Sequence, residues 1–164
     1  MSRNRNADIA ADTLKRLETG AYIAPSGLER DLSTKLEAAK SGTLFYEPHA
    51  LESLNFGASG LETLLEVTPE STLEAARRVT ADGSRVALLN FASAKNPGGG
   101  FLGGAQAQEE SLARSSGLYP CLLAAPGFYS FHRAQHDLRY SNRMIYSPDV
   151  PFFKDDDGAS LETP

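Results

Sequence analysis

One stretch of the sequence brings together residue types that can do chemistry. An apolar run passes through Asn90, five glycines follow within residues 98–104, and Glu109 and Glu110 stand directly behind them. Glycines leave no side chain between backbone and ligand and tolerate left-handed torsions, so their amide hydrogens can surround a phosphate or a ribose. We therefore predict a ligand-binding loop with a carboxylate pair at its exit.

Two common nucleotide-binding patterns fit this loop poorly. Residues 98–103 formally satisfy G-x-G-x-x-G, but four residues separate the glycines from the strand, and Pro97 forces Asn96 into an extended conformation. No Gly-Lys-Ser or Gly-Lys-Thr follows, as a P-loop requires. A plain surface loop is the remaining structural alternative. Ligand binding is the interpretation that we carry forward.

Helical patterns surround the loop. Apolar residues at three- and four-residue steps predict a first helix over Ile9 to Leu17 that ends at Gly20. A capping box of Ser26 and Glu29 predicts a second helix, which ends at Gly42 and carries an apolar stripe of Leu28, Leu32, Leu36 and Ala39. Further helices are predicted over residues 71–81, with Pro69 in the first turn, and over residues 108–115.

Strand-like runs lie between these helices, at residues 43–47, 63–67, 85–91 and 144–146. The run over 85–91 is nearly continuous in its apolar character, which is typical of an inner strand covered on both faces. Residues 155–158 read as an exposed turn. The alternation indicates an α/β or α+β fold with a sheet and flanking helices.

Composition limits the setting. A chain of 164 residues with 41% apolar content can bury one core, so we expect a single domain over residues 1–164. The net charge of -5 gives no broad basic surface, so no direct nucleic-acid partner is expected. Cys121 is the one cysteine of the sequence, which excludes a disulfide framework, and its place in an apolar run indicates a buried hydrophobe. With neither a signal-like start nor an 18-residue apolar run, the chain reads as soluble and cytoplasmic, without membrane contact.

A metal site is not indicated. His132 and His136 are four residues apart and would share one face of a helix, but no third ligand is evident and no glutamate follows in the metalloprotease manner. We interpret the pair as a polar helix face or loop. No cofactor is expected.

Three short motifs then carry a resemblance. Residues 90–93 (Asn-Phe-Ala-Ser), 96–100 (Asn-Pro-Gly-Gly-Gly) and 108–110 (Gln-Glu-Glu) resemble the signature of the poly(ADP-ribose) glycohydrolases, above all their microbial branch, with residues 101–107 as the spacer. The resemblance extends to residues 5–22, 112–119 and 144–153. It implies a macrodomain-like α/β/α sandwich with extra N-terminal helices that binds the terminal ADP-ribose of a polymer and hydrolyses the ribose–ribose bond.

The resemblance also implies roles for individual residues. Glu110 would protonate the leaving oxygen and later deprotonate water, while Glu109 would hydrogen-bond ribose hydroxyls. The remaining substrate-binding candidates are Asn96, Gly98, Gly99, Gly100, Gln108, Asn90, Ser93 and Phe101, the last of which reads equally as a core anchor for the loop.

The chemistry of the two carboxylates can be argued from the residues. Adjacent side chains on a helix diverge by about 100°, so the two carboxylates do not easily flank one bond and one of them must do most of the proton transfer. A helix N-terminus favours the ionised form, so an acid role for Glu110 requires desolvation or a neighbouring charge to raise its pKa.

The resemblance ends at Pro164, whereas the family's domain continues. A second glycine-rich loop and an adenine-stacking aromatic residue have no counterpart here, so the sequence predicts an incomplete sheet with an unpaired edge. A fragment, a half completed by another chain and a degenerate copy are all compatible with this. We carry forward a glycohydrolase acting on poly(ADP-ribose) or ADP-ribosylated proteins, a non-catalytic ADP-ribose-binding module or inactive remnant, and, last, a Rossmann-type NAD binder.

Overall fold

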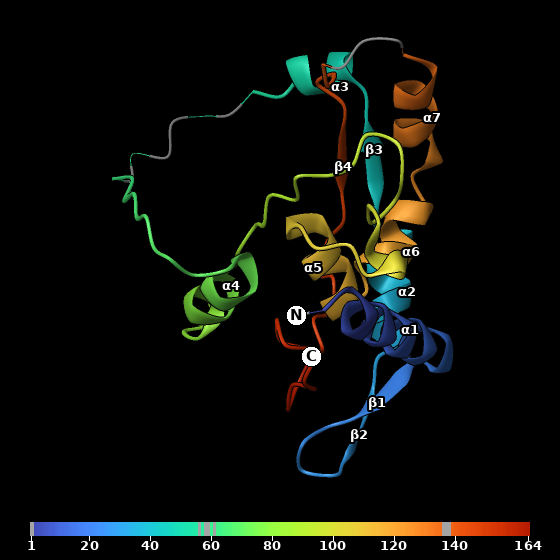
Figure 1. Cartoon of the computed structure of the whole chain (residues 1–164). Coiled ribbons are helices and arrows are strands. Elements are labelled where there is room, and N and C mark those ends of the chain that lie inside the picture. The colour runs from blue at the N-terminus through green and yellow to red at the C-terminus, as the bar shows by residue number, and fades with distance from the viewer. Residues whose placement is uncertain (1, 56, 58–59, 61, 136–138) are drawn as a thin grey trace.

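The chain folds into helices and two small sheets, and the hairpin of residues 21–31 extends from the body beside the first helix (Figure 1). The computed structural model describes residues 2–55, 57, 60, 62–135 and 139–164. In chain order the elements are α1 (Arg3–Thr19), β1 (Ala21–Ile23), β2 (Glu29–Asp31), α2 (Ser33–Ser41), β3 (Leu44–Tyr46), α3 (Pro48–Glu52), α4 (Thr72–Thr80), the 3-10 turn η1 (Phe101–Gly103), α5 (Gln108–Ser115), α6 (Leu118–Leu123), α7 (Pro126–Ala134) and β4 (Met144–Tyr146).

Both sheets are antiparallel pairs. β1 and β2 form a local hairpin in which Tyr22 lies opposite Arg30. β3 pairs with β4, so that Phe45 lies opposite Ile145 across a long stretch of sequence. The chain combines helices with strands, which confirms the predicted α/β class. The strands of the described residues form these two pairs rather than one central sheet.

α1 supports the glycine loop from below. The Ser2 hydroxyl accepts a hydrogen bond from the Arg5 amide at 3.3 Å and caps the start of the helix, and Gly20, at φ 70°, ends it as predicted. The helix lies against η1 and α5, where Ala10 packs on Phe101 and Ala113. The N-terminal helix thus fixes the platform on which the loop rests.

A second and larger core is formed by side chains of α4, α5, α6 and α7. Its buried members are Leu73, Leu112, Leu118, Leu122, Phe128 and Tyr129. Side chains of β3 and β4 cover one side of it. This core holds α5 in place and so orients the carboxylates on its first turn.

The C-terminal segment ties α1 to α5. The amides of Phe153 and Lys154 both donate to the Ser115 carbonyl, at 3.0 and 3.2 Å. The buried Lys154 ammonium donates to the Ile9 carbonyl at 2.9 Å and forms an ion pair with Asp12 at 2.8 Å. Burial lowers the pKa of Lys154, against the opposing effect of Asp12.

The predicted second helix is wrong in its first half. Residues 29–31 form β2, and α2 begins only at Ser33. The Ser26 hydroxyl does not cap a helix but donates to Glu162 at 2.6 Å, and Leu28 is 57% exposed. Pairing with β1 outweighs the local capping signal, because tertiary contacts routinely override propensity.

The strands predicted over 63–67 and 85–91 are also not formed. Both segments belong to the long excursion that carries α4 to the side of the body (Figure 1). Leu65 and Val67 are 87% and 101% exposed, and Leu89 and Phe91 are 72% and 69% exposed. A strand needs a neighbouring backbone to pair with, and no described residue provides one here.

The remaining predictions of local structure are confirmed. The strand over 43–47 corresponds to β3, the strand over 144–146 to β4, and the helix over 108–115 to α5. The helix over 71–81 corresponds to α4, although Ser71 rather than the proline begins it, through a capping box with Glu74. Residues 156–158 form the predicted turn, and Cys121 is buried. Among the described residues, no helix has the length and hydropathy that crossing a membrane would require.

Candidate active site

The glycine loop is a closed turn anchored by a buried aromatic ring. Gly98 and Gly99 have φ values of 70° and 61°, which favour glycine. The Gly99 amide donates to the Asn96 carbonyl at 2.9 Å. The Phe101 ring lies directly beneath Gly98 and meets Tyr119 edge-on at 5.0 Å. Phe101 is completely buried, so the structure supports its role as the loop anchor and leaves no ring surface for a ligand.

Glu109 is the buried carboxylate of the pair. Its side chain accepts hydrogen bonds from the Ser93 amide at 2.7 Å and from Asn90 Nδ2 at 3.4 Å. Burial raises the pKa of the Glu109 carboxyl, the hydrogen bonds from Ser93 and Asn90 oppose this shift, and the charge of Glu110 adds to it. Glu109 therefore joins α5 to the end of the 85–91 segment.

Glu110 is the accessible carboxylate. It is partly exposed, and its Oε1 accepts a hydrogen bond from the Gly100 amide at 2.9 Å. The glycine loop thus binds a carboxylate of the protein itself through one of its backbone amides.

The two carboxylates meet at Gly99. A β-carbon at this position would lie 2.9 Å from Cδ of Glu110 and 3.2 Å from Oε2 of Glu109. Adjacent side chains on a helix are expected to diverge, but these two carboxylates both lie beside Gly99. The Glu109 carboxylate is held there by the Ser93 amide and the Glu110 carboxylate by the Gly100 amide. Only a glycine fits between them.

Gln108 uses its amide group on the protein backbone. Its Nε2 donates to the Leu89 carbonyl at 2.7 Å, and its Oε1 accepts from the Phe91 amide at 2.9 Å. A carbonyl and the amide two residues later point to the same edge of an extended chain, so this side chain takes the place of a neighbouring strand. A third contact joins Nε2 to the Thr72 hydroxyl at 3.3 Å. In this structure Gln108 supports the site from the protein side.

Replacing Gln108 is expected to release the 89–91 backbone. Gln108→Leu should make the Phe91 amide exchange its hydrogen about tenfold faster, since the amide loses its acceptor. Gln108→Glu is the matched control, because a carboxylate still accepts from Phe91 although it no longer donates to Leu89. The exchange rate of the Phe91 amide is measured by NMR. Equal rates in the wild type and in Gln108→Leu would show that the Gln108 side chain does not hold the 89–91 backbone.

The pKa of Glu109 predicts a pH dependence of stability. A raised pKa means that the folded chain holds this proton more tightly than the unfolded chain does, so the free energy of unfolding falls as pH rises from the ordinary value of 4.5 toward the raised value. Glu109→Gln removes this loss. We expect the variant to gain stability relative to the wild type across that pH window, as measured by urea unfolding. A difference that stays constant with pH would contradict the assignment.

Ser93 and Asn96 form the turn before the glycines. The Ser93 hydroxyl accepts from the amides of Lys95 and Asn96 at 3.3 and 3.2 Å, and Asn96 is exposed beside the loop. Arg133 of α7 donates to the Lys95 carbonyl at 2.7 Å and fixes the turn from outside. The structure therefore brings the predicted polar residues to one side of the glycine loop, together with Asn90.

Sequence reasoning missed two buried residues near the carboxylates. Arg114, 3% exposed, donates to carbonyl and amide oxygens at the end of the glycine loop. Tyr129 is buried, its hydroxyl has no hydrogen-bond partner in the described part, and burial followed by the charge of Glu109 raises its pKa. Neither position carries a sequence signal, because an arginine in a last helical turn and a tyrosine in an apolar stripe are common.

His132 has a structural role. Its Nδ1 lies 2.8 Å from the Phe128 carbonyl, and its Nε2 lies 2.9 Å from the Ser141 hydroxyl. The ring is buried rather than part of a polar helix face. His136 lies outside the described residues. Within the described ranges, no cluster of His, Cys, Asp and Glu side chains is arranged to hold a metal ion.

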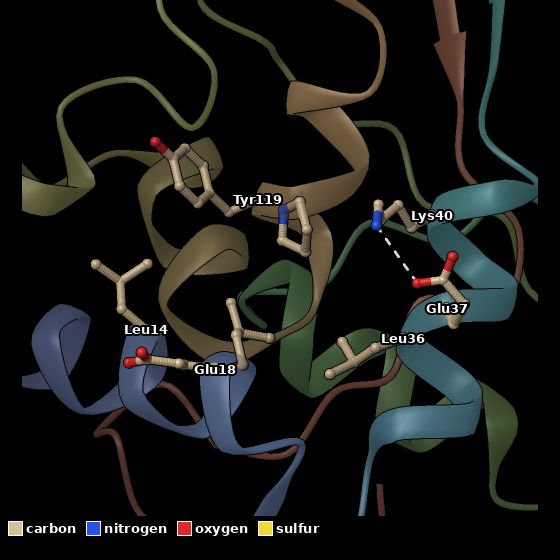
Figure 2. Close-up of a pocket in the computed structure, with 8 residues that line it drawn as sticks. Leu14, Glu18, Leu36, Glu37, Lys40 and Tyr119 are labelled. Carbon is tan, nitrogen blue, oxygen red and sulfur yellow. Dashed lines mark hydrogen bonds and ion pairs between the residues drawn. The ribbon is translucent and has the colours of Figure 1, made fainter.

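A surface groove lies away from the carboxylates. Leu14, Leu36 and Tyr119 line it between α1, α2 and α6, and the Glu37–Lys40 ion pair at 3.4 Å stands on its rim (Figure 2). None of the predicted site residues borders this groove. The site is defined by the glycine loop and the first turn of α5.

These features define an α/β protein with a glycine loop closed over a carboxylate pair. Residues 10–155 match the family described as microbial-type PARG, catalytic domain, where PARG is poly(ADP-ribose) glycohydrolase. The chain belongs to this family. No match was found among the curated proteins.

Solved structures of bacterial PARGs are similar to the chain. The enzyme from Thermomonospora curvata is 52% identical with a TM-score of 0.91, and the match covers 97% of this chain and 60% of that one. The same protein bound to the inhibitor ADP-HPD is 51% identical, with a TM-score of 0.88 and coverages of 97% and 58%. The PARG from Deinococcus radiodurans in complex with ADP-ribose is 47% identical, with a TM-score of 0.72 and coverages of 79% and 54%. The chain thus spans about 60% of the length of the Thermomonospora curvata protein.

Proposed function

We propose that this chain is part of a poly(ADP-ribose) glycohydrolase catalytic domain and carries the catalytic glutamates. The observation that supports this best is that an accessible carboxylate, Glu110, is held by the Gly100 amide next to a buried carboxylate, Glu109. Carboxyl groups in different environments can divide acid–base and binding roles between them. Membership of the family and the ADP-ribose and ADP-HPD complexes of its relatives support the same assignment.

In the proposed reaction Glu110 acts as the acid and then as the base. As the ribose–ribose bond breaks, its carboxyl proton passes to the leaving 2′-oxygen, and the bond electrons leave with that oxygen. The resulting oxocarbenium-like sugar is attacked by water, which returns a proton to the carboxylate. Glu109 binds ribose hydroxyls, and Asn96 and the amides of the glycine loop position the sugar and phosphates.

The proposed partners are poly(ADP-ribose), ADP-ribose and ADP-ribosylated proteins. No direct nucleic-acid contact is proposed, because the net charge is -5. We also propose that the reaction takes place in the cytoplasm, a compartment in which a free thiol such as that of Cys121 stays reduced.

A second candidate is a non-catalytic ADP-ribose-binding module. The exposed apolar residues of 63–67 and 85–91 favour it, because they show that the strands expected beside the site are not formed in the described residues. One experiment separates the two functions. The purified chain is incubated with poly(ADP-ribose), released ADP-ribose is measured by chromatography, and ADP-ribose binding is measured by calorimetry.

Release of ADP-ribose together with binding supports the glycohydrolase. Binding without release supports the module. Folded protein that neither binds nor releases ADP-ribose contradicts both functions for this chain.

A further inference from the structure

Arg114 is a buried cation beneath the glycine loop. It is 3% exposed, and none of the described carboxylates forms an ion pair with it. Its Nη1 donates to the Ala105 carbonyl at 2.6 Å, and its Nη2 donates to Gln106 Oε1 at 2.5 Å and to the Ser111 hydroxyl at 3.3 Å. Its charge is therefore directed at neutral oxygens, two of which belong to the end of the loop.

A chain of hydrogen bonds leads from this guanidinium to the accessible carboxylate. The Ala105 carbonyl accepts from Arg114, and the Ala105 amide donates to the Gly100 carbonyl at 3.2 Å. The Gly100 amide in turn donates to Glu110 Oε1 at 2.9 Å. The Gly100 carbonyl also accepts from the Gly103 amide at 3.1 Å. The carbonyl and the amide of Gly100 are therefore both hydrogen-bonded, and Ala105 is one of the two residues that set the position of Gly100 from its carbonyl side.

The first helix holds the same segment from the other side. Asn6 Nδ2 donates to Gln106 Oε1 at 3.0 Å and to the Gly104 carbonyl at 3.4 Å. The Thr13 hydroxyl donates to the Arg114 carbonyl. Residues 104–106 are thus held between α1 and the guanidinium, by the buried side chains of Asn6 and Arg114.

Burying a charge without an ion-pair partner costs free energy, and an apolar side chain of similar volume would fill this space at lower cost. The forked guanidinium offers what such a residue lacks, namely several donors in a fixed plane. In addition, the attraction of Glu110 and Asp156 opposes the effect of burial, which lowers the pKa of Arg114.

We propose that Arg114 is the positioning residue of the site: it fixes residues 105–106 so that the Gly100 amide engages the Glu110 carboxylate. The consequence for turnover rests on the proposed function, whereas the effect on the Gly100 hydrogen bond does not. The guanidinium of Arg114 donates to Ala105, Gln106 and Ser111 and to neither glutamate, so its role is to position the loop.

Amide hydrogen exchange of Gly100, followed by NMR on the full chain, tests the proposal directly. Gly100 is exposed, so its protection comes from the bond to Glu110. We expect exchange about tenfold faster in Arg114→Met and an intermediate rate in Arg114→Lys, which keeps one donor group but not the fork. Glu110→Gln reports on the same bond from its acceptor side.

Lys154→Met is the matched control, because it removes another buried cation that contacts α1 without touching the loop. It should lower stability and leave Gly100 exchange at the wild-type rate. Unchanged Gly100 exchange in a folded Arg114→Met, or in Arg114→Lys if the methionine variant does not fold, overturns the proposal. An equal acceleration in Lys154→Met overturns it as well, since the effect would then follow stability alone.

Turnover gives a second readout. In a chain that hydrolyses the polymer, Arg114→Lys is expected to lower kcat about tenfold at nearly constant KM, because the proton-transferring group is displaced while the ligand contacts remain. A change confined to KM would contradict the positioning role. If the wild-type chain shows no turnover, the proposed function fails for this chain, and the exchange measurement still decides the role of Arg114.

Discussion

Glu110→Gln is expected to reduce release of ADP-ribose from poly(ADP-ribose) by about 10²–10⁴-fold, because an amide neither gives nor takes the proton. Affinity for ADP-ribose should change little. The glutamine oxygen still accepts the hydrogen bond that the Gly100 amide now donates to Glu110 at 2.9 Å, so the loop keeps its shape. Chromatography measures the release and calorimetry measures the affinity.

Glu74→Gln is the control for this variant. Glu74 also lies in the first turn of a helix and also accepts a backbone amide, that of Ser71 at 2.8 Å, but it belongs to α4. Its replacement should leave release unchanged. Turnover that survives in Glu110→Gln would remove this residue from the proton transfer, and loss of turnover in both variants would point to stability instead.

Gly99→Ala is the second variant with a large expected effect. The added β-carbon would meet the carboxylates of Glu110 and Glu109, and φ of 61° already disfavours any residue but glycine. One carboxylate must move by a substantial fraction of an ångström or more, and misplacement of this order costs about 10²-fold in rate. We expect release of ADP-ribose to fall by about this factor, and ADP-ribose binding to weaken because the loop is distorted.

Gly83→Ala separates the two causes. Gly83 has a φ of 84°, and no atom lies near the place of an added β-carbon. An alanine there therefore costs about 1–2 kcal/mol of backbone strain and causes no clash. It should lower stability and leave binding and turnover at wild-type levels. If Gly99→Ala behaves like Gly83→Ala, the contact between Gly99 and the carboxylates is not important for function.

The sequence predicted helices and strands correctly where the tertiary contacts favour the same local structure as the sequence pattern. An apolar stripe and Gly20 placed the end of α1 correctly, although the helix begins earlier, at Arg3, and α5 followed from its position after the glycines. The helix expected from Ser26 failed because pairing of β2 with β1 competes with the capping box. The strand expected over 85–91 failed because extended structure requires a second backbone, which no local pattern supplies.

The sequence by itself determined the family and the chemical groups of the site. The glycine triplet, the spacer and the Gln-Glu-Glu motif are contiguous, so their spacing is readable without a fold. Their placement on a loop followed by a helix was also predictable, because glycine and helical periodicity act over a few residues.

Only the tertiary structure decided the surroundings of each group in the site. Burial raises the pKa of Glu109, and it depends on Ser93 and Asn90, which approach from another segment. Gln108 turned out to hold backbone, and Arg114 turned out to lie under the loop. Solvation and hydrogen-bond partners arise from residues far apart in sequence, so they are fixed by packing and not by spacing along the chain.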